Sequence, residues 1–354
     1  MQSGETKGNF MAERAIETTA RDKSMLGAYG IPIPVRQGMY LVQVPLPHSP
    51  LMVLNSYIIL GENETTVIDV GYDNPACEEA LTNALHALGR DWDSVQIILT
   101  HSHPDHTGNL NRVYREGMHV YANFHSFEEV QYLQDLEDNV SHPLLRKIAS
   151  EEDLRLLNEE RVALTAERLP IECQAHLQYL REGDKIECGE FSFTVIETPG
   201  HNPWHICLYD ENEKLMIMGD HILERSTPAV SSWFTSYNAL ATYHASLEKI
   251  QKYDIDIVLA GHGTPYSNPA ARADAIIKHD YERLEEIYEL VAQGHADLID
   301  ISSHTKWRYA NWDKWPIDQK FYSMGETMAH LVYLVEKGKV KQINCGGERR
   351  FELA

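Results

Sequence analysis

The sequence predicts an α/β protein in which two β-rich halves form two sheets layered between helices. Short β-branched runs alternate with turn residues from about Tyr40 to Thr100, and the same rhythm returns after Asp184. Helical stretches separate the strands of each half, which is typical of layered α/β folds. The composition of the 354 residues, 43% hydrophobic and 24% charged, is that of a globular protein with a substantial core.

The first half contains four predicted strands and one predicted helix. The strands lie within residues 39–44, 55–60, 65–71 and 94–100. The helix runs from Pro75 to Leu88 and stops at Gly89, since glycine commonly follows a helix C-terminus. Its apolar residues share one face and should pack on a sheet: Ala80, Leu81, Ala84, Leu85 and Leu88.

The second half contains five predicted strands and two predicted helices. The strands lie within residues 184–187, 191–198, 205–210, 214–220 and 254–263. One helix is expected around Tyr243 to Lys252, and a longer one begins at Asn268-Pro269 and ends at Gly294.

Three segments flank or interrupt this pattern. Residues 1–37 are an N-terminal extension, and residues 38–294 are the main domain. Within it, residues 126–167 lack strand signals and carry the helix-start pattern Ser126-x-x-Glu129, which predicts a helical insertion. Residues 295–354 contain a predicted helix, 324–338, followed by two short strands, so a winged-helix-like module is expected there.

Charge and cysteine content exclude several classes of protein. A net charge of -22 repels nucleic-acid backbones and anionic membranes, and the few basic residues near the C-terminus are interpreted as a solvated feature. The five scattered cysteines fit no disulfide framework, no apolar signal-peptide core lies in the first 25 residues, and no apolar run is long enough to cross a bilayer. We therefore expect a cytoplasmic protein that acts on a small molecule and does not bind membranes, with a homodimer as an open alternative.

A cluster of potential metal ligands follows the strand 94–100. The segment ILTHSHPDHTGN places His101, His103, Asp105 and His106 within six residues. The first two can point one way while the last two turn toward a second point, which suits two adjacent metals rather than one. The alternative is a polar loop that happens to be rich in histidine.

Three later motifs repeat the order of apolar strand, glycine and one ligand-type side chain. They are Thr198-Pro199-Gly200-His201, Gly219-Asp220 and Gly261-His262-Gly263. Glycine allows close backbone approach, which converging ligands require. Taken singly, each of these side chains would more often be an ordinary surface or turn residue.

Together these motifs resemble the metallo-β-lactamase-fold hydrolases, and in style the glyoxalase II-like and lactonase-like members. The resemblance covers about Met39 to Tyr266, where NSYII and VIDVG also match the family's opening strands. It implies a four-layered αββα fold. The same ligand set serves several chemistries, so the motifs are specific for the fold and not for the substrate.

The resemblance also implies roles for individual residues. One metal would be held by His101, His103 and His201, a second by Asp105, His106 and His262, and Asp220 would bridge the two. Two divalent ions are expected, zinc first, with iron or manganese open. Asp105 and Asp220 would be the catalytic acids, which orient the attacking hydroxide.

Neighbouring residues are expected to support these ligands. The acid of VIDVG, Asp69, is interpreted as a partner that orients a ligand histidine. Four further histidines near the motifs are assigned to structure: His48, His205, His221 and His244.

The predicted function is that of a dinuclear metal-dependent hydrolase that attacks a small ester, thioester or lactone with a metal-bound hydroxide. The alternatives are a metal-dependent nuclease, which would need a basic groove, and an iron-dependent oxygenase, which would need one metal and consume oxygen. A non-catalytic scaffold ranks last because all seven ligand-type residues are present.

Overall fold

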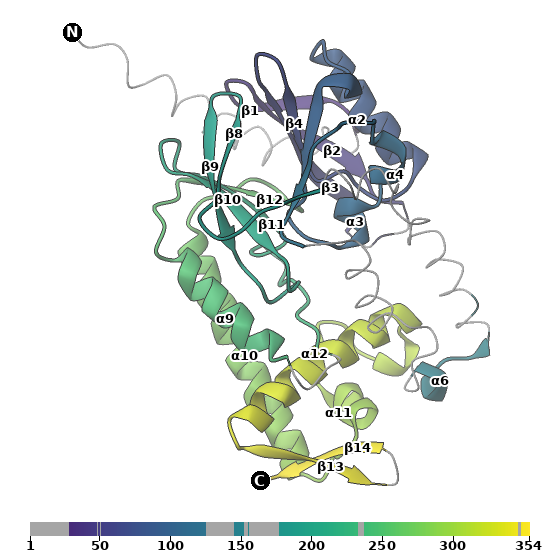
Figure 1. Cartoon of the computed structure of the whole chain (residues 1–354). Coiled ribbons are helices and arrows are strands. Elements are labelled where there is room, and N and C mark those ends of the chain that lie inside the picture. Colours follow the sequence, from purple (N-terminus) through teal and green to yellow (C-terminus); the bar gives the residue numbers. More distant parts are fainter. Residues whose placement is uncertain are drawn as a thin grey trace.

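The computed structural model describes residues 28–47, 49, 51–124, 145–151, 155, 177–232, 237–345 and 348–354. Two β-sheets lie against each other, with helices on their outer faces (Figure 1). Helices α2 (Pro75–Ala87) and α4 (Leu110–Val113) cover the first sheet. Helices α9 (Ala239–Ile250) and α10 (Pro269–Ala292) belong to the layer beyond the second sheet. The predicted α/β fold is confirmed.

In the part of the chain that the structure describes, the first sheet has seven strands, which follow one another in chain order. Strands β1 to β4 are antiparallel neighbours, and β4 to β7 are parallel. The strands are β1 (Pro32–Arg36), β2 (Met39–Pro45), β3 (Val53–Leu60), β4 (Thr65–Ile68), β5 (Val95–Ile98), β6 (Val120–Ala122) and β7 (Leu177–Tyr179).

Three strands of this sheet were not predicted. Strand β1 contains Pro32 and Pro34, which weaken a strand pattern but are tolerated at a sheet edge. Strands β6 and β7 have three residues each, too few to show alternation.

The second sheet has five strands in the order β12-β11-β10-β9-β8, and all five were predicted. Only β11 and β12 are parallel, and α9 lies between them in the chain. The strands are β8 (Lys185–Cys188), β9 (Phe191–Glu197), β10 (Ile206–Asp210), β11 (Leu215–Gly219) and β12 (Ile257–Ala260).

Side-chain alternation divides the core into three clusters. In β11, Leu215 and Ile217 pack between the sheets, whereas Met216 and Met218 pack toward the helices. A further cluster joins the first sheet to α2 and α4 and includes Leu81. Three apolar layers separate four structural layers, as the resemblance implied.

The C-terminal residues form the predicted helix and hairpin, and a second helix that was not predicted precedes them. They are α11 (Leu298–His304), α12 (Ile317–Glu336), β13 (Val340–Cys345) and β14 (Glu348–Leu353). Helix α12 begins at Ile317, whereas the predicted helix began at Met324. The first turns were missed because their buried residues, Ile317 and Phe321, are separated by polar residues that conceal the apolar pattern. Met328, Leu331 and Leu334 are buried in the cluster that contains α9 and α10.

The remaining helices of the described residues are short. They are η1 (Trp92–Ser94), α3 (Pro104–Thr107), α6 (Leu145–Ile148) and η2 (Trp312–Lys314). The predicted insertion 126–167 lies outside the described residues except for 145–151 and 155, and so does the N-terminal extension before residue 28. In the described part of the chain, no helix combines the length and apolarity needed to span a membrane.

Candidate metal centre

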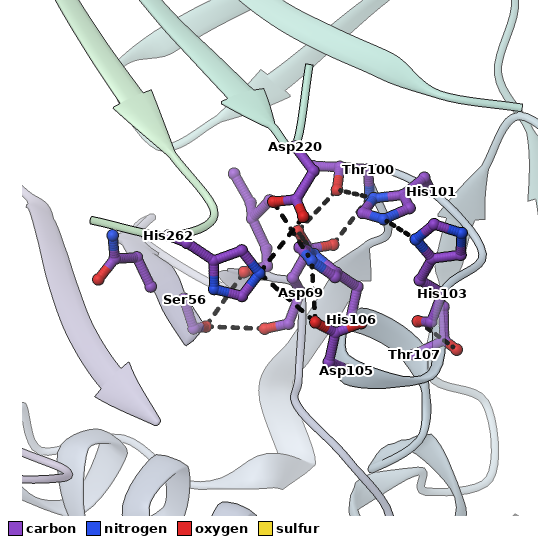
Figure 2. Close-up of polar contacts among 12 residues, drawn as sticks. Ser56, Asp69, Thr100, His101, His103, Asp105, His106, Thr107, Asp220 and His262 are labelled. Atoms are coloured by element: carbon purple, nitrogen blue, oxygen red, sulfur yellow. Dashed lines mark hydrogen bonds and ion pairs between the residues drawn. The ribbon is translucent and has the colours of Figure 1, made fainter. Parts of the chain in front are cut away.

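The chain brings all seven predicted ligand residues together at one edge of the two sheets. The segment after β5 supplies His101, His103, Asp105 and His106, while the turns after β9, β11 and β12 each supply one residue. Those three residues are His201, Asp220 and His262. In Figure 2, Asp220 lies between His262 on one side and His101 on the other.

The backbone of the first motif changes from extended to helical at Pro104. His103 is still extended, and Pro104 then begins the single turn of α3. The backbone N–H groups of His106 and Thr107 donate to the carbonyl of His103 at 3.0 and 3.1 Å. This turn places Asp105 and His106 on α3, after the extended His101 and His103, and the rings of His101 and His106 lie with centroids 4.1 Å apart.

The ligand atoms form overlapping groups, two of which correspond to the predicted metal sites, and Asp220 joins His101 and His106 in a third. Within each of these two groups, the ligand atoms lie within 4.8 Å of one another. The first group is His101, His103 and His201, and the second is Asp105, His106 and His262. The carboxylate of Asp220 lies 3.9 Å from Nε2 of His201, 3.6 Å from Nε2 of His106 and 3.3 Å from Nε2 of His262.

Hydrogen bonds at Nδ1 hold four of these imidazoles in one tautomer. His106 donates to Asp69 Oδ2, His201 to the carbonyl of Ala229 and His262 to the carbonyl of Val53, each at 2.7 Å. His101 faces the Thr100 hydroxyl at 3.1 Å. Because Nδ1 keeps its proton, Nε2 of each ring faces the centre, where a bound cation would take its lone pair. His103 differs, because its Nδ1 faces Nε2 of His101 at 3.1 Å.

The inner atoms fit a cation. Among the described residues, Nε2 of His106, His201 and His262 and Oδ1 of Asp220 are buried and make no hydrogen bond. Buried polar atoms are almost always satisfied, so orphaned ones that face each other indicate a binding site. Imidazole nitrogens and carboxylate oxygens are the donors that zinc, iron and manganese accept.

The electrostatics of the centre differ from one ligand to the next, since the pKa of His262 is raised and the pKa of His103 is lowered. Burial lowers the pKa of His262, but the carboxylates of Asp220 and Asp105 outweigh it and raise the pKa to about 10. Burial raises the pKa of Asp105, yet His106 and His262 hold it at about 2. Burial and His201 lower the pKa of His103 to about 3. The two carboxylates thus stay ionised, and His103 stays neutral with a free lone pair.

Asp69 orients the ligand His106 through a hydrogen bond, as the sequence predicted. Its carboxylate accepts the backbone N–H of Thr100 at 2.8 Å and the Thr100 hydroxyl at 2.7 Å, besides the bond from His106. The residue adopts φ +59, a left-handed conformation that is uncommon for aspartate. The Thr100 hydroxyl donates to Asp69 and accepts from His101, so one carboxylate orients ligands of both groups.

Two glycines are required by close packing around Asp220. A Cβ at Gly219 would lie 2.6 Å from Thr100 Oγ1 and 2.8 Å from His205 Nε2. A Cβ at Gly261 would lie 2.6 Å from Asp220 Oδ1 and 2.8 Å from His106 Cε1. Both glycines therefore allow the close approach that the motifs predicted.

The two sheets are tied together next to the centre. The backbone N–H of Ile206 donates to the carbonyl of Thr100 at 2.8 Å, and that of Asn55 to the carbonyl of Gly261 at 2.7 Å. The Tyr57 hydroxyl donates to the carbonyl of Ala260, also at 2.7 Å. These bonds fix strand ends from opposite sheets relative to one another.

His205 has a contact that the sequence analysis did not anticipate. Its Nε2 accepts the backbone N–H of Asp220 at 3.1 Å, and its ring stacks on that of His101 with centroids 5.0 Å apart. The only signal in the sequence is its position four residues after His201. His244 has a structural role, since it bonds Asp280 across α9 and α10 at 2.9 Å, and His48 lies outside the described residues.

The fold and site define the class of protein. A model of the metallo-beta-lactamase superfamily matches residues 51–262, more than half of the chain, and the chain belongs to that superfamily. It is a metal-dependent hydrolase, as the sequence predicted.

Individual relatives agree with this class. The chain is 26% identical over 302 residues to a probable metallo-hydrolase, YqjP, of Bacillus subtilis, with 82% of this chain and 90% of that protein covered. It is 24% identical over 225 residues to the human acyl-coenzyme A thioesterase MBLAC2, covering 59% of this chain and 72% of that protein.

Solved structures show the same fold. A beta-lactamase domain protein from Burkholderia ambifaria superposes with a TM-score of 0.78 at 23% identity, covering 92% of this chain and 95% of that one. A metallo-beta-lactamase family protein from Thermus thermophilus has a TM-score of 0.70 at 26% identity, with 91% and 100% covered.

Proposed function

We propose that this chain is a dinuclear hydrolase that cleaves a small-molecule thioester, with esters and lactones as slower substrates. The observation that carries the proposal is the set of inward-facing atoms of His106, His201, His262 and Asp220, which are buried and make no hydrogen bond of their own. Seven donors in two groups exceed what one tetrahedral site can use.

His101, His103 and His201 would hold one ion, Asp105, His106 and His262 a second, and Asp220 lies where it can reach both. Zinc suits this mixture of imidazole and carboxylate, with iron or manganese as alternatives. When bound, two divalent ions supply a water of lowered pKa and polarise the acyl oxygen.

The carboxylates of the chain orient the attacking water. Asp105 Oδ2 lies 3.4 Å from His262 Nε2, and Asp220 Oδ2 lies 3.3 Å from the same atom. Because the pKa values of both acids are held low, they accept hydrogen bonds from water and do not carry a proton of their own at neutral pH.

The low pKa of these acids favours a thioester. A thiolate leaves without prior protonation because the pKa of a thiol is about 8.5. An alkoxide is a far stronger base and requires a proton donor. The similarity to a protein named as an acyl-coenzyme A thioesterase supports the same substrate class.

A metal analysis followed by a substrate panel tests the proposal. Protein purified without chelator is expected to hold two ions per chain and to hydrolyse acyl-coenzyme A thioesters faster than oxygen esters and lactones of the same acyl group. Preferential cleavage of a phosphodiester would favour a nuclease, and one iron per chain with oxygen consumption would favour an oxygenase. Either outcome would contradict the proposal.

A further inference from the structure

Two histidines and an aspartate meet near the end of α10, on residues that the centre above does not use. We infer that His295, Asp300 and His304 form a separate zinc site on the surface. Their ligand atoms lie within 4.8 Å of one another, and no role in the proposed hydrolysis requires them.

The spacing of these atoms resembles that of ligands around zinc. Nδ1 of His295 lies 2.9 Å from Oδ2 of Asp300, and Nδ1 of His304 lies 3.1 Å from Oδ1 of Asp300. With zinc bonds of about 2.0–2.1 Å, tetrahedral geometry puts neighbouring ligand atoms roughly 3.3 Å apart. Small side-chain shifts are therefore enough to admit the ion.

The backbone that carries the three residues is held from several sides. His295 donates its N–H to the carbonyl of Leu290 at 3.1 Å, and Phe351 of β14 donates to the carbonyl of Ala296 at 2.8 Å. Asp297 caps α11 by accepting the N–H of Asp300 at 2.9 Å. Preorganised ligands lose less conformational freedom when an ion binds.

The donor set selects the chemical class of ion. Two imidazoles and one carboxylate suit zinc, whereas magnesium and calcium prefer oxygen ligands. The side chains of His295, Asp300 and His304 are 23%, 37% and 52% exposed, so water can complete the coordination. Nδ1 of His304 also donates to the carbonyl of Asp300 at 2.9 Å. Zinc would replace this bond, so we expect weaker affinity than at the dinuclear centre.

The location indicates a structural role. Figure 1 shows α11 beside the β13–β14 hairpin and away from α3, which carries Asp105 and His106. An ion bound by His295 and His304 would link a residue that precedes α11 in the chain to the last residue of α11. Occupancy should therefore raise thermal stability and leave turnover of the hydrolase unchanged.

Zinc titration of the full chain tests the inference. Wild-type protein with its catalytic centre loaded is expected to bind one more equivalent of Zn²⁺ than Asp300→Asn and His304→Ala. The control is His279→Ala, which removes an exposed histidine on α10 and should bind as much zinc as wild type. The test measures the difference in bound zinc between wild type and variants, so its result does not depend on whether the catalytic centre binds one ion or two.

A second measurement on unmodified protein covers variants that fold poorly. Zn²⁺ added to the loaded wild type should shift the imidazole NMR signals of His295 and His304 and leave that of His279 in place. Equal zinc content in wild type and both site variants, or no shift of the two signals, would mean a hydrogen-bonded cluster only and would overturn the inference.

Discussion

The backbone N–H of Asp220 donates to Nε2 of His205 at 3.1 Å, in a buried layer directly behind the metal centre. An amide is always a donor, so Nε2 is unprotonated and the proton of His205 lies on Nδ1, which donates to the Thr198 hydroxyl at 2.8 Å. His205 therefore fixes the backbone of Asp220 while its ring stacks on His101.

Replacing His205 with leucine should weaken metal binding and turnover together. The variant loses the acceptor for the Asp220 N–H, and loss of such supporting contacts costs about 10–100-fold in metal affinity. His205→Gln is the matched control, because its side-chain oxygen can accept the same N–H. Competition with a chromophoric chelator measures affinity, and equal affinity in His205→Leu and wild type would refute a positioning role.

Asp220→Ala should lower the occupancy of both proposed metal sites and abolish turnover, because this carboxylate contacts ligands of both groups. Asp93→Ala, at an exposed acid on η1, should keep the full metal content. Elemental analysis of the two variants measures the effect. Full loading with two ions in Asp220→Ala would show that Asp220 does not bridge.

Gly261→Ala should disturb the centre through a steric clash, since the new Cβ would lie 2.6 Å from Asp220 Oδ1. Gly263→Ala is the control. Its Cβ meets open space, and its φ of +88 adds only backbone strain of about 1–2 kcal/mol. We expect reduced metal affinity in the first variant and a lower melting temperature with normal metal content in the second. Normal metal binding by both would contradict the steric argument.

Metal binding should release protons at neutral pH. Without a cation, the pKa of His262 is about 10, and that of His106 is also raised by nearby carboxylates after the opposing effect of burial. The pKa of His262 lies above pH 7, so this ring is protonated in the metal-free protein, and metal affinity should rise with pH toward 10. The raised pKa of His106 acts in the same direction. Calorimetry in buffers of different ionisation enthalpy counts the protons, and a count of zero at pH 7 would contradict this electrostatic account.

The same linkage predicts the stability of metal-free protein. A histidine whose folded pKa is raised stabilises the fold fully below its unfolded value of about 6.5, and this stability is lost as pH rises toward the folded value. Metal-free wild type should therefore become less stable between pH 6.5 and 10, and His262→Asn should reduce that slope. Thermal melts across this range measure the difference.

Leu331→Ala should destabilise the whole chain by about 2–5 kcal/mol, because the side chain is 0% exposed in the core cluster shared with α9 and α10. Leu353→Ala, at a residue that is 40% exposed, should cost far less. Denaturant unfolding measures both. A cost below 1 kcal/mol for Leu331→Ala would mean that α12 contributes little to the core.

The sequence by itself determined the layered α/β fold and most strands, and it predicted the residues that meet in the candidate metal centre. The apolar run 215–219 and the glycines before His262 and Asp220 are local signals, which can be recognised in the sequence without knowledge of tertiary contacts. Short strands such as β6 were not predicted, because three residues are too few to show a periodic pattern. The first turns of α12 were not predicted, because polar neighbours conceal the buried Ile317.

Tertiary structure alone decided how these residues meet. The Nδ1 atoms of His201 and His262 donate to the carbonyls of Ala229 and Val53, and no residue type marks a carbonyl as an acceptor. The bond from Asp220 to His205 likewise depends on packing between two strand ends. The chain path brings these groups together, and side-chain identity fixes only what they can do once they have met.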